Sequence, residues 1–447
     1  MNCLKKICIT LFLFLIIFVS GCTSTYASTI PDTYSSACLL MEESTGKILY
    51  SKNANSIMYP ASTTKIMTAI LTLEKCNLSD TAVVSHNAVF SIPSGYSTAS
   101  LVEGEVLTIE QLLNVLLIPS ANDAAVVLAE HIAGSVEAFS DMMNANDAAN
   151  VLAEHIAGSI SSFATMMNTK ASEIGCTGTH FVNPNGIHNE NHYSTAYDLA
   201  LIGKYAMQFP TFKEISSKTR YTLPITNAYS KEDRIFNTTN DLIKPNYSSS
   251  PTNYYYKYAT GGKTGYTDPA GQCIVATATK DNISLIAVTL HGDFTEDNLS
   301  QRALDCKALF EYGFNNFSMV SIAQKGDVAS NMKVPNATKD SSSLDLLYSD
   351  DIYAFVPNGF DTSSVTPNIK LSSTFAPIAQ DTVLGTISYD IDGSNYSCNL
   401  LASHEVYKNQ FAKTAMELSL LLIFLILLSK VLKRKKRRKN YRKKPKK

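Results

Sequence analysis

The sequence predicts an α/β (α+β) domain in which helices flank one sheet, followed by a small all-β domain and a C-terminal transmembrane helix. Three observations predict this order. Strand-like segments at both ends of the region before Phe317 enclose a helical middle. Beyond Phe317, short alternating strands and turn residues take over, and an apolar run then precedes a Lys/Arg-rich end.

Composition and charge narrow the class of protein. The 447 residues give room for two to three domains, and 45% hydrophobic with 17% charged residues is typical of a globular protein. Residues 430–447 hold thirteen Lys or Arg and no acid, and without these and Lys5 and Lys6 the body has 23 basic against 39 acidic side chains. The body is therefore acidic, which argues against nucleic acid as a partner.

The N-terminus has the pattern of a signal peptide at residues 1–27. Two lysines precede an apolar run, and small residues follow it with a possible cleavage site at Thr25-Tyr26-Ala27. Val19-Ser-Gly-Cys22 also fits a lipoprotein box, in which Cys22 becomes the acylated N-terminus. Ordinary cleavage and lipidation both stay open.

A catalytic domain is predicted at residues 30–318. Its first element is a hairpin at 37–50, with a turn through Ser44-Thr-Gly46. Pro60-Ala-Ser62 then begins a helix with apolar residues at helical spacing, which places Ser62 at its N-terminus and Lys65 one turn on. Helices are expected at 108–174, strands at 272–279 and 283–290 that share a sheet with the first hairpin, and a closing helix at 299–312.

The helical middle contains a tandem repeat. Residues 121–144 and 145–168 are identical at 18 of 24 positions. The first copy is preceded by Ser120 and begins the triplet Ser120-Ala-Asn122, whereas the second gives Asn144-Ala-Asn146, without the hydroxyl. We therefore assign the functional triplet to the first copy. The extra residues are expected to form a helical hairpin at about 136–158 that turns near Asn144, and the alternative is that they disturb the site.

Three regions complete the chain. A small β domain is predicted at 319–406, where Asp392-Gly393 between two alternating runs marks a hairpin. The apolar segment at 411–432 is predicted to span a membrane, and an amphipathic interfacial helix is the alternative. Because the basic tail at 433–447 marks the cytoplasmic side and can contact anionic lipid, we expect a single-pass cell-membrane protein with its body outside the cytoplasm.

Three short motifs, in order, carry the chemistry: Ser62-Thr-Thr-Lys65, Ser120-Ala-Asn122 and Lys263-Thr-Gly265. A serine one helical turn from a lysine is a nucleophile with a candidate base. The backbone amides at a helix N-terminus suit a developing oxyanion. Each motif alone is weak, but the ordered set is characteristic of penicillin-binding proteins and serine β-lactamases.

With these motifs, residues 35–405 resemble the serine-type D-Ala-D-Ala carboxypeptidases, the low-molecular-mass penicillin-binding proteins of peptidase family S11. The resemblance extends to Thr45-Gly-Lys-Ile-Leu-Tyr50, Asn183-Pro-Asn-Gly186, Tyr193-Ser-Thr-Ala-Tyr-Asp198 and Gly262-Lys-Thr-Gly-Tyr-Thr267. It implies a β-lactamase/transpeptidase-like fold. It also implies a peptidoglycan stem peptide ending in D-Ala-D-Ala as substrate and β-lactam antibiotics as covalent inhibitors.

The resemblance assigns roles to matching residues. Ser62 is the expected nucleophile, Lys65 the base that takes its proton, and Ser120 the relay to the leaving D-Ala amine. Asn122 orients the substrate, and Lys263 adds positive potential. The remaining expected substrate contacts are Thr264 and Gly265, the Tyr266 amide that shares the oxyanion hole with the Ser62 amide, and Arg302 as a further carboxylate contact.

No metal or cofactor is implied. His188 and His192 lie four apart, with His180 upstream, but Asn183-Pro-Asn-Gly186 predicts a loop there, so a structural role is favoured over zinc. The six cysteines after the signal region are too scattered for a disulfide framework. Tyr254–Tyr258 is interpreted as strand packing, with glycan stacking as the alternative.

The prediction is thus a membrane-anchored, penicillin-sensitive D-alanyl-D-alanine carboxypeptidase that works through a serine acyl-enzyme. Two alternatives remain. One is a peptidoglycan-binding or penicillin-binding protein whose catalysis the duplication impairs. The other is a serine β-lactamase, although an obvious deacylating glutamate is missing and the extra β domain is unexplained by it.

Overall fold

The computed structural model describes residues 29–141, 148–244, 254–297, 299–372 and 374–441. The predicted signal peptide therefore lies outside the described residues, as does the end of the basic tail. The chain divides into two compact units, one up to Phe317 and one from Ser318 onward. The border predicted from the sequence, between residues 318 and 319, lies one residue further along the chain.

The first unit is built on a five-stranded antiparallel sheet with the order β2-β1-β9-β8-β7. Its strands are β1 (Ala37–Glu42), β2 (Ile48–Lys52), β7 (Ala259–Thr267), β8 (Gly271–Lys280) and β9 (Ile283–Gly292). Because β1 pairs with β9, the prediction that the first hairpin and the late strands share one sheet is confirmed.

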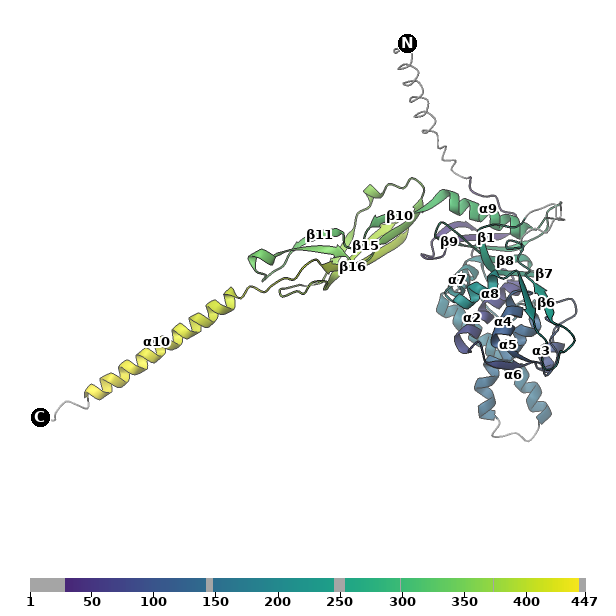
Figure 1. The fold of residues 1–447 in the computed structure, drawn as a ribbon, viewed down its shortest axis with the longest axis horizontal. Coiled ribbons are helices and arrows are strands. Elements are labelled where there is room, and N and C mark those ends of the chain that lie inside the picture. Colours follow the sequence, from purple (N-terminus) through teal and green to yellow (C-terminus); the bar gives the residue numbers. More distant parts are fainter. Residues whose placement is uncertain (1–28, 142–147, 245–253, 298, 373, 442–447) are drawn as a thin grey trace, which may run out of the picture. The chain divides into compact units, whose positions relative to one another are not determined.

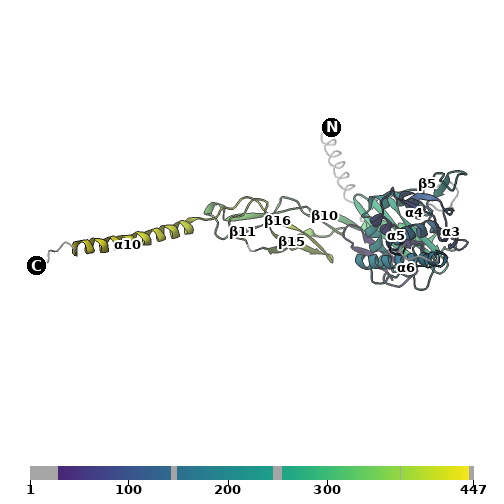
Figure 2. The same cartoon turned by 90° about the horizontal axis from the view of Figure 1, so that it is seen from below.

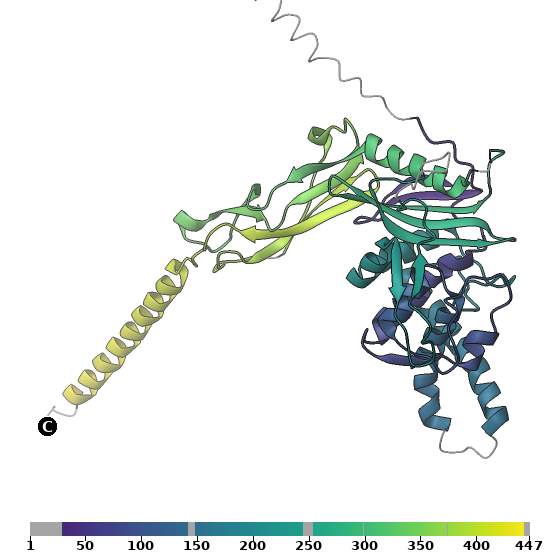
Figure 3. The ribbon, with the colours of Figure 1, turned by 45° about the vertical axis from the view of Figure 1, so that its right-hand side comes forward.

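Helices cover both faces of this sheet (Figures 1 and 3). On one face lies α9 (Gln301–Asn316), and on the other lies a helical layer. That layer contains α2 (Lys65–Lys75), α4 (Ile109–Leu117), α5 (Asn122–Asp141), α6 (Ala148–Ile174), α7 (Ala196–Ala206) and α8 (Pro210–Ser217). Double coverage explains why all six residues of β1 are buried, instead of alternating with polar ones.

Two short antiparallel strand pairs and a small helix stand beside the helical layer and frame the site described below. They are β3 (Thr81–Val83) with β4 (Val106–Thr108), β5 (Arg220–Leu223) with β6 (Arg234–Asn237), and α3 (His86–Phe90). The predicted helix at Ser62 differs in detail. Residues Ala61–Thr64 form a 3₁₀ turn, with Ala61 at a φ of 46°, and α2 begins only at Lys65.

The duplicated segment forms a helical pair. Helix α5 runs to Asp141 and α6 begins at Ala148, with 142–147 between them outside the described residues. The two helices lie side by side and project from the helical layer (Figures 1 and 3). Figure 2 shows the same unit from below, with α5 and α6 labelled next to each other. The predicted hairpin around Asn144 is therefore confirmed for the helices on either side.

The embedded part of this pair combines the two copies. The first half of copy one is buried, including Val126, Leu128 and Ile132. The second half of copy two supplies Phe163 and Met167, both 0% exposed. The first half of copy one and the second half of copy two together therefore contribute the equivalent of one repeat to the core. The additional 24 residues lie between these two halves in the sequence.

The second unit consists of β strands and a terminal helix. A five-stranded sheet has the order β11-β12-β16-β15-β14, and β10 pairs with β13. Their bounds are β10 (Phe317–Ala323), β11 (Val328–Lys333), β12 (Ser343–Tyr348), β13 (Ile352–Pro357), β14 (Asn368–Leu371), β15 (Val383–Ile391) and β16 (Ser394–Ala402). Asp392 and Gly393, both at positive φ, connect β15 to β16 as predicted.

Helix α10 (Phe411–Tyr441) follows this β domain. Within the described ranges, no helix combines the length and the apolar composition that a membrane crossing requires. The transmembrane helix predicted at 411–432 is therefore not supported. Its continuous apolar run, Leu420–Leu428, is shorter than the ~20 residues of a typical span, and the same helix continues directly into basic residues.

Candidate active site

The two side chains of the Ser-x-x-Lys motif contact each other at the start of α2. Lys65 Nζ lies 2.8 Å from Ser62 Oγ, 2.7 Å from Asn122 Oδ1 and 2.7 Å from the backbone oxygen of Asn185. Lys65 is fully buried. Burial and the nearby charge of Lys263 hold the pKa of Lys65 well below its usual value, although Asp123 opposes this. The side chain of Lys65 is thus suited to be a neutral amine beside Ser62.

The Ser120-Ala-Asn122 triplet lies at the turn before α5. Ser120 has a φ of 67° and lines the cleft next to Ser62. Both the backbone N–H and the side-chain Nδ2 of Asn122 donate to Ser97 O, each at 2.9 Å. Because Nδ2 is engaged there, Asn122 Oδ1 is directed toward Lys65. The structure therefore brings the triplet of copy one into the site, as predicted.

The Lys-Thr-Gly motif lies on β7, opposite the serine. Lys263 is 1% exposed and donates to Thr264 O at 2.8 Å, and burial together with Arg302 lowers its pKa to about 7. A Cβ on Gly265 would lie 2.9 Å from the Ser62 backbone nitrogen. Glycine at this position therefore lets β7 approach the nucleophile closely.

Arg302 reaches the same strand from α9. Its Nη1 donates to Gly265 O at 3.2 Å, and its Nη2 lies 3.8 Å from Asp241 Oδ2. The guanidinium lines the cleft together with Thr264. The predicted further carboxylate contact is thus placed where a substrate carboxylate beside β7 would be within its reach.

These residues open into one cleft of about 450 Å³. Seven of the nine predicted site residues line it: Ser62, Ser120, Asn122, Thr264, Gly265, Tyr266 and Arg302. Lys65 and Lys263 lie buried behind its surface. The Tyr266 side chain is 56% exposed and its hydroxyl donates to Asp268 at 3.0 Å, which leaves the backbone of Tyr266 as its contribution to the predicted oxyanion hole.

Three elements of the site were missed by the sequence analysis. The carbonyl of Asn185 contacts Lys65, Thr239 Oγ1 lies 2.5 Å from Thr264 Oγ1, and residues 94–97 form a wall of the cleft. Asn183-Pro-Asn-Gly186 was predicted as a loop, and Gly186, with a φ of 80°, allows this loop to approach the 3₁₀ turn. No local pattern marks Thr239 or the wall.

The histidines have structural roles here. His192 is 2% exposed; its Nδ1 accepts from Val182 N at 3.1 Å, so its Nε2 donates to Thr64 Oγ1 at 2.8 Å. Burial, with smaller contributions from His180, His188 and Lys65, lowers the pKa of His192 to about 3. Across the described ranges, no group of three potential ligands is arranged to hold a metal ion.

The tyrosine run and the cysteines are also explained by packing. Tyr256 is 6% exposed and stacks on Phe310 of α9 with ring centroids 5.7 Å apart. The six described cysteines are free thiols, and Cys38, Cys273 and Cys306 among them are buried. This agrees with small apolar residues in a core that needs no cross-links.

Comparisons with known proteins identify the family. The family model described as D-alanyl-D-alanine carboxypeptidase, peptidase S11, matches residues 24–145 and 144–294, and the model of the penicillin-binding protein 5 C-terminal domain matches 317–408. The fold and these matches define a serine-type hydrolase. The chain belongs to the D-alanyl-D-alanine carboxypeptidase family, and the first match breaks at the junction of the two repeats.

Individual relatives agree. The chain is 30% identical over 378 residues to D-alanyl-D-alanine carboxypeptidase DacF of Bacillus subtilis, covering 83% of this chain and 85% of that protein. Penicillin-binding protein 5 of Haemophilus influenzae shares 26% identity with a TM-score of 0.62, covering 85% and 99%. A peptidoglycan synthesis regulatory factor (PBP3) of Streptococcus pneumoniae shares 25% identity with a TM-score of 0.66, covering 84% of this chain and 100% of that chain.

Proposed function

We propose that this protein removes the terminal D-Ala from peptidoglycan stem peptides through an acyl-enzyme on Ser62, and that the duplication leaves this activity intact. The observation that carries the proposal is the position of Lys65 Nζ. It lies within 2.8 Å of Ser62 Oγ while two carbonyl oxygens, Asn122 Oδ1 and Asn185 O, lie at 2.7 Å.

This arrangement makes Lys65 a directed base. A neutral amine has two hydrogens and one lone pair. Because the two carbonyl oxygens accept its hydrogens, the lone pair is left facing Ser62 Oγ. Lys65 then takes the hydroxyl proton as Ser62 attacks the substrate carbonyl.

The opposite wall of the cleft suits the rest of the substrate. Thr264 and Thr239 present hydroxyls beside the guanidinium of Arg302, a set that fits the terminal carboxylate. The amides of Ser62 and Tyr266 stabilise the oxyanion, and Ser120 passes a proton to the departing D-Ala amine. A β-lactam acylates Ser62 as a mimic of this substrate.

The structure favours retained activity over impairment by the repeat. The inserted residues lie between Ala133 and Ile160, whereas Ser120 and Asn122 precede them; Ser120 lines the cleft and Asn122 contacts Lys65. A β-lactamase is the second candidate, and rapid turnover of the penicillin adduct would favour it.

We further propose that α10 attaches the enzyme to the cell membrane. Leu420 to Leu428 are each 43–60% exposed in this helix, and basic residues follow at once. An exposed apolar run next to positive charge has the composition of a lipid-bound segment. Co-sedimentation with vesicles containing anionic lipid tests this: deletion of 411–447 should abolish it, and sedimentation unchanged by the deletion would refute it.

The catalytic proposal is tested by intact-mass spectrometry of the full chain with and without a penicillin, beside Ser62→Ala. The expected result is a penicillin-sized gain that is absent from the variant, together with D-Ala release from a stem pentapeptide. A folded protein that binds the peptide but neither gains mass nor releases D-Ala would favour the impaired binding protein.

A further inference from the structure

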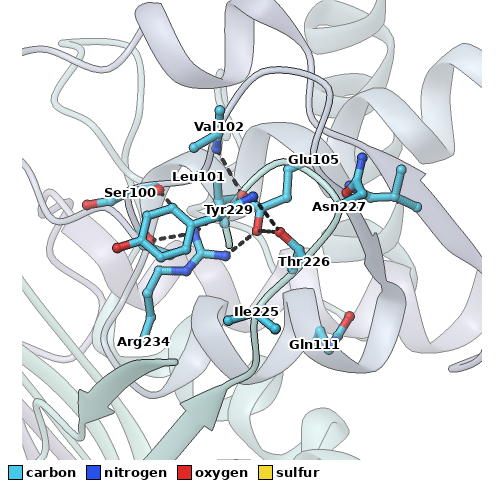
Figure 4. A network of polar contacts seen from close by, with 12 residues as sticks. Ser100, Leu101, Val102, Glu105, Gln111, Ile225, Thr226, Asn227, Tyr229 and Arg234 are labelled. Carbon is cyan, nitrogen blue, oxygen red and sulfur yellow. Dashed lines mark hydrogen bonds and ion pairs between the residues drawn. The ribbon is translucent and has the colours of Figure 1, made fainter. Parts of the chain in front are cut away.

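A buried ion pair lies outside the cleft, next to its wall (Figure 4). Arg234 on β6 is 7% exposed and Glu105 is 0% exposed, and both Nη atoms of Arg234 contact the Glu105 carboxylate. The guanidinium also lies 4.4 Å from the ring centre of Tyr229. A pair this deeply buried costs desolvation energy, and hydrophobic residues of the same volume are often no less stable. Its presence therefore needs an explanation beyond stability.

The ion pair holds the backbone that continues the cleft wall. Arg234 Nη1 donates to Ser100 O at 3.0 Å and to Ala99 O at 3.4 Å. Glu105 Oε2 accepts from Val102 N at 2.9 Å. Figure 4 shows these contacts converging from the β5–β6 hairpin on the segment before β4. Residues just after the wall at 94–97 are thus fixed by a charged side chain from another part of the chain.

A second buried side chain, the carboxylate of Asp123, holds the same segment through its amides. Asp123, 2% exposed, accepts from Ala99 N at 3.0 Å and from Leu101 N at 3.1 Å. Ser100 between them has a φ of 52°, a strained conformation for a non-glycine residue. Arg234 thus binds the carbonyls of this short turn and Asp123 binds its amides. Two independent sets of hydrogen bonds therefore fix the conformation of the turn.

The turn leads directly to a catalytic contact. Ser97 O, two residues before Ala99, accepts both hydrogen bonds that orient the Asn122 amide. Asn122 Oδ1 in turn accepts from Lys65. A shift of the turn would move Ser97 O, free the amide to rotate, and remove one of the two acceptors that direct the Lys65 lone pair.

The pair also connects to the other wall. Thr226 in the β5–β6 hairpin donates to Glu105 Oε1 at 2.7 Å, and Asn227 bonds the backbone of Gly104 and Val106 at 2.9 and 2.8 Å. The strand that begins at Arg234 ends at Asn237, and Thr239, two residues further along the chain, contacts Thr264 through its hydroxyl. Both sides of the cleft are thus connected to one ion pair.

We propose that Glu105 and Arg234 are positioning residues for acyl transfer, which fix the Ser97–Leu101 turn and through it the orientation of Asn122. This inference rests on the proposed function, since it concerns the rate at which Ser62 is acylated. The main role of the Glu105–Arg234 pair is then to increase the acylation rate of Ser62, and its contribution to the stability of the fold is secondary.

The test compares acylation with folding. Arg234→Met leaves Glu105 buried without its partner, so this variant should lose both thermal stability and acylation rate. The double variant Arg234→Met/Glu105→Leu removes both charges and should regain most of the stability. Its acylation rate constant at saturating penicillin should stay at least ~10-fold below that of the wild type, since the turn has lost its carbonyl partner.

Controls separate the possible outcomes. Lys213→Met breaks a more exposed ion pair with Glu43 and should leave the acylation rate unchanged. Arg234→Lys keeps the charge but not the planar fork and should acylate at an intermediate rate. If neither Met variant folds, Arg234→Lys decides: slower acylation supports the proposal and a wild-type rate overturns it.

A folded double variant that acylates at the wild-type rate would also overturn the proposal. Absence of acylation in the wild-type protein would instead refute the proposed function. The two failures are therefore distinguishable in one set of measurements.

Discussion

The two repeats allow a test in which two shortened proteins differ at a single residue. Deleting Val136–Ser159 removes 24 residues and leaves the first half of copy one joined to the second half of copy two. Deleting Ala121–Asn144 also removes 24 residues and leaves copy two. Both products keep the Ser-Ala-Asn triplet, and they differ only in having Val126 or Asn150 at one position of α5.

The structure sets the size of the expected difference. Val126 is 4% exposed in the core. Losing a buried valine costs about 1.5–2 kcal/mol, and burying an amide there without a partner costs about 1–3 kcal/mol more. The protein with Asn150 should therefore be about 3–4 kcal/mol less stable, which corresponds to a Tm roughly 10 °C lower for a domain of this size.

The protein with Val126 should match or exceed the full-length chain in Tm, because a shorter connection costs less closure entropy. Its acylation by penicillin should stay within ~3-fold of the full-length rate, a change of less than about 1 kcal/mol in the barrier. Thermal unfolding and timed intact-mass spectra measure both quantities. Equal Tm values for the two deletions would refute the embedding of Val126, and loss of acylation in both would show that the projecting helices are needed.

Three further predictions concern the buried lysines and the turn at Asn185. Burial lowers the pKa of Lys263 from 10.5 to about 7, so between these pH values the unfolded chain binds more protons than the folded one. This residue therefore makes the free energy of unfolding rise with pH from 7 to 10.5. Urea unfolding should show a weaker rise in Lys263→Met. The same variant should shift the acid limb of the pH profile of acylation to higher pH, since the pKa of Lys65 rises when the neighbouring charge of Lys263 is lost. An unshifted acid limb in Lys263→Met, or a shifted one in Lys263→Arg, would count against this prediction. Gly186→Ala should cost more than 1 kcal/mol and slow acylation, because its Cβ would lie 1.9 Å from a backbone oxygen and displace Asn185; Gly175→Ala, also at positive φ but with open space, is the control whose acylation should not change.

Local patterns account for the part of the fold that the sequence predicted. Strand alternation and the Asp392-Gly393 turn depend on neighbours along the chain, so the strands and the β15–β16 hairpin followed from them. That β1 and β9 share a sheet was predicted from strands at both ends of a helical middle, and their order in the sheet was not predicted. The Ser-x-x-Lys spacing likewise depends on one helical turn. The 3₁₀ turn at Ala61–Thr64 did not follow, since its backbone is set by β7 and the Asn183–Gly186 turn packing against it.

The parts of the site that were missed come from contacts between distant segments. Asn185 reaches Lys65 across 120 positions of the chain, and Arg234 reaches Glu105 across 129. Neither residue stands in a pattern that differs from an ordinary loop or strand. Residue types and short spacings identify the nucleophile and its base, whereas the acceptors that direct the base become visible only in three dimensions.

The three acceptors around Lys65 also explain how one buried lysine can serve both halves of the reaction. As an amine, Lys65 places its two hydrogens on Asn122 and Asn185 and its lone pair toward Ser62. After proton transfer, the ammonium has three hydrogens, and the same two carbonyls with Ser62 Oγ supply three acceptors at 2.7–2.8 Å. Because the charged form is solvated without rearrangement, its burial costs less than that of an unpaired charge. Removing the Asn122 side-chain carbonyl, or displacing the Asn185 backbone carbonyl, should therefore slow acylation by impairing both forms of Lys65.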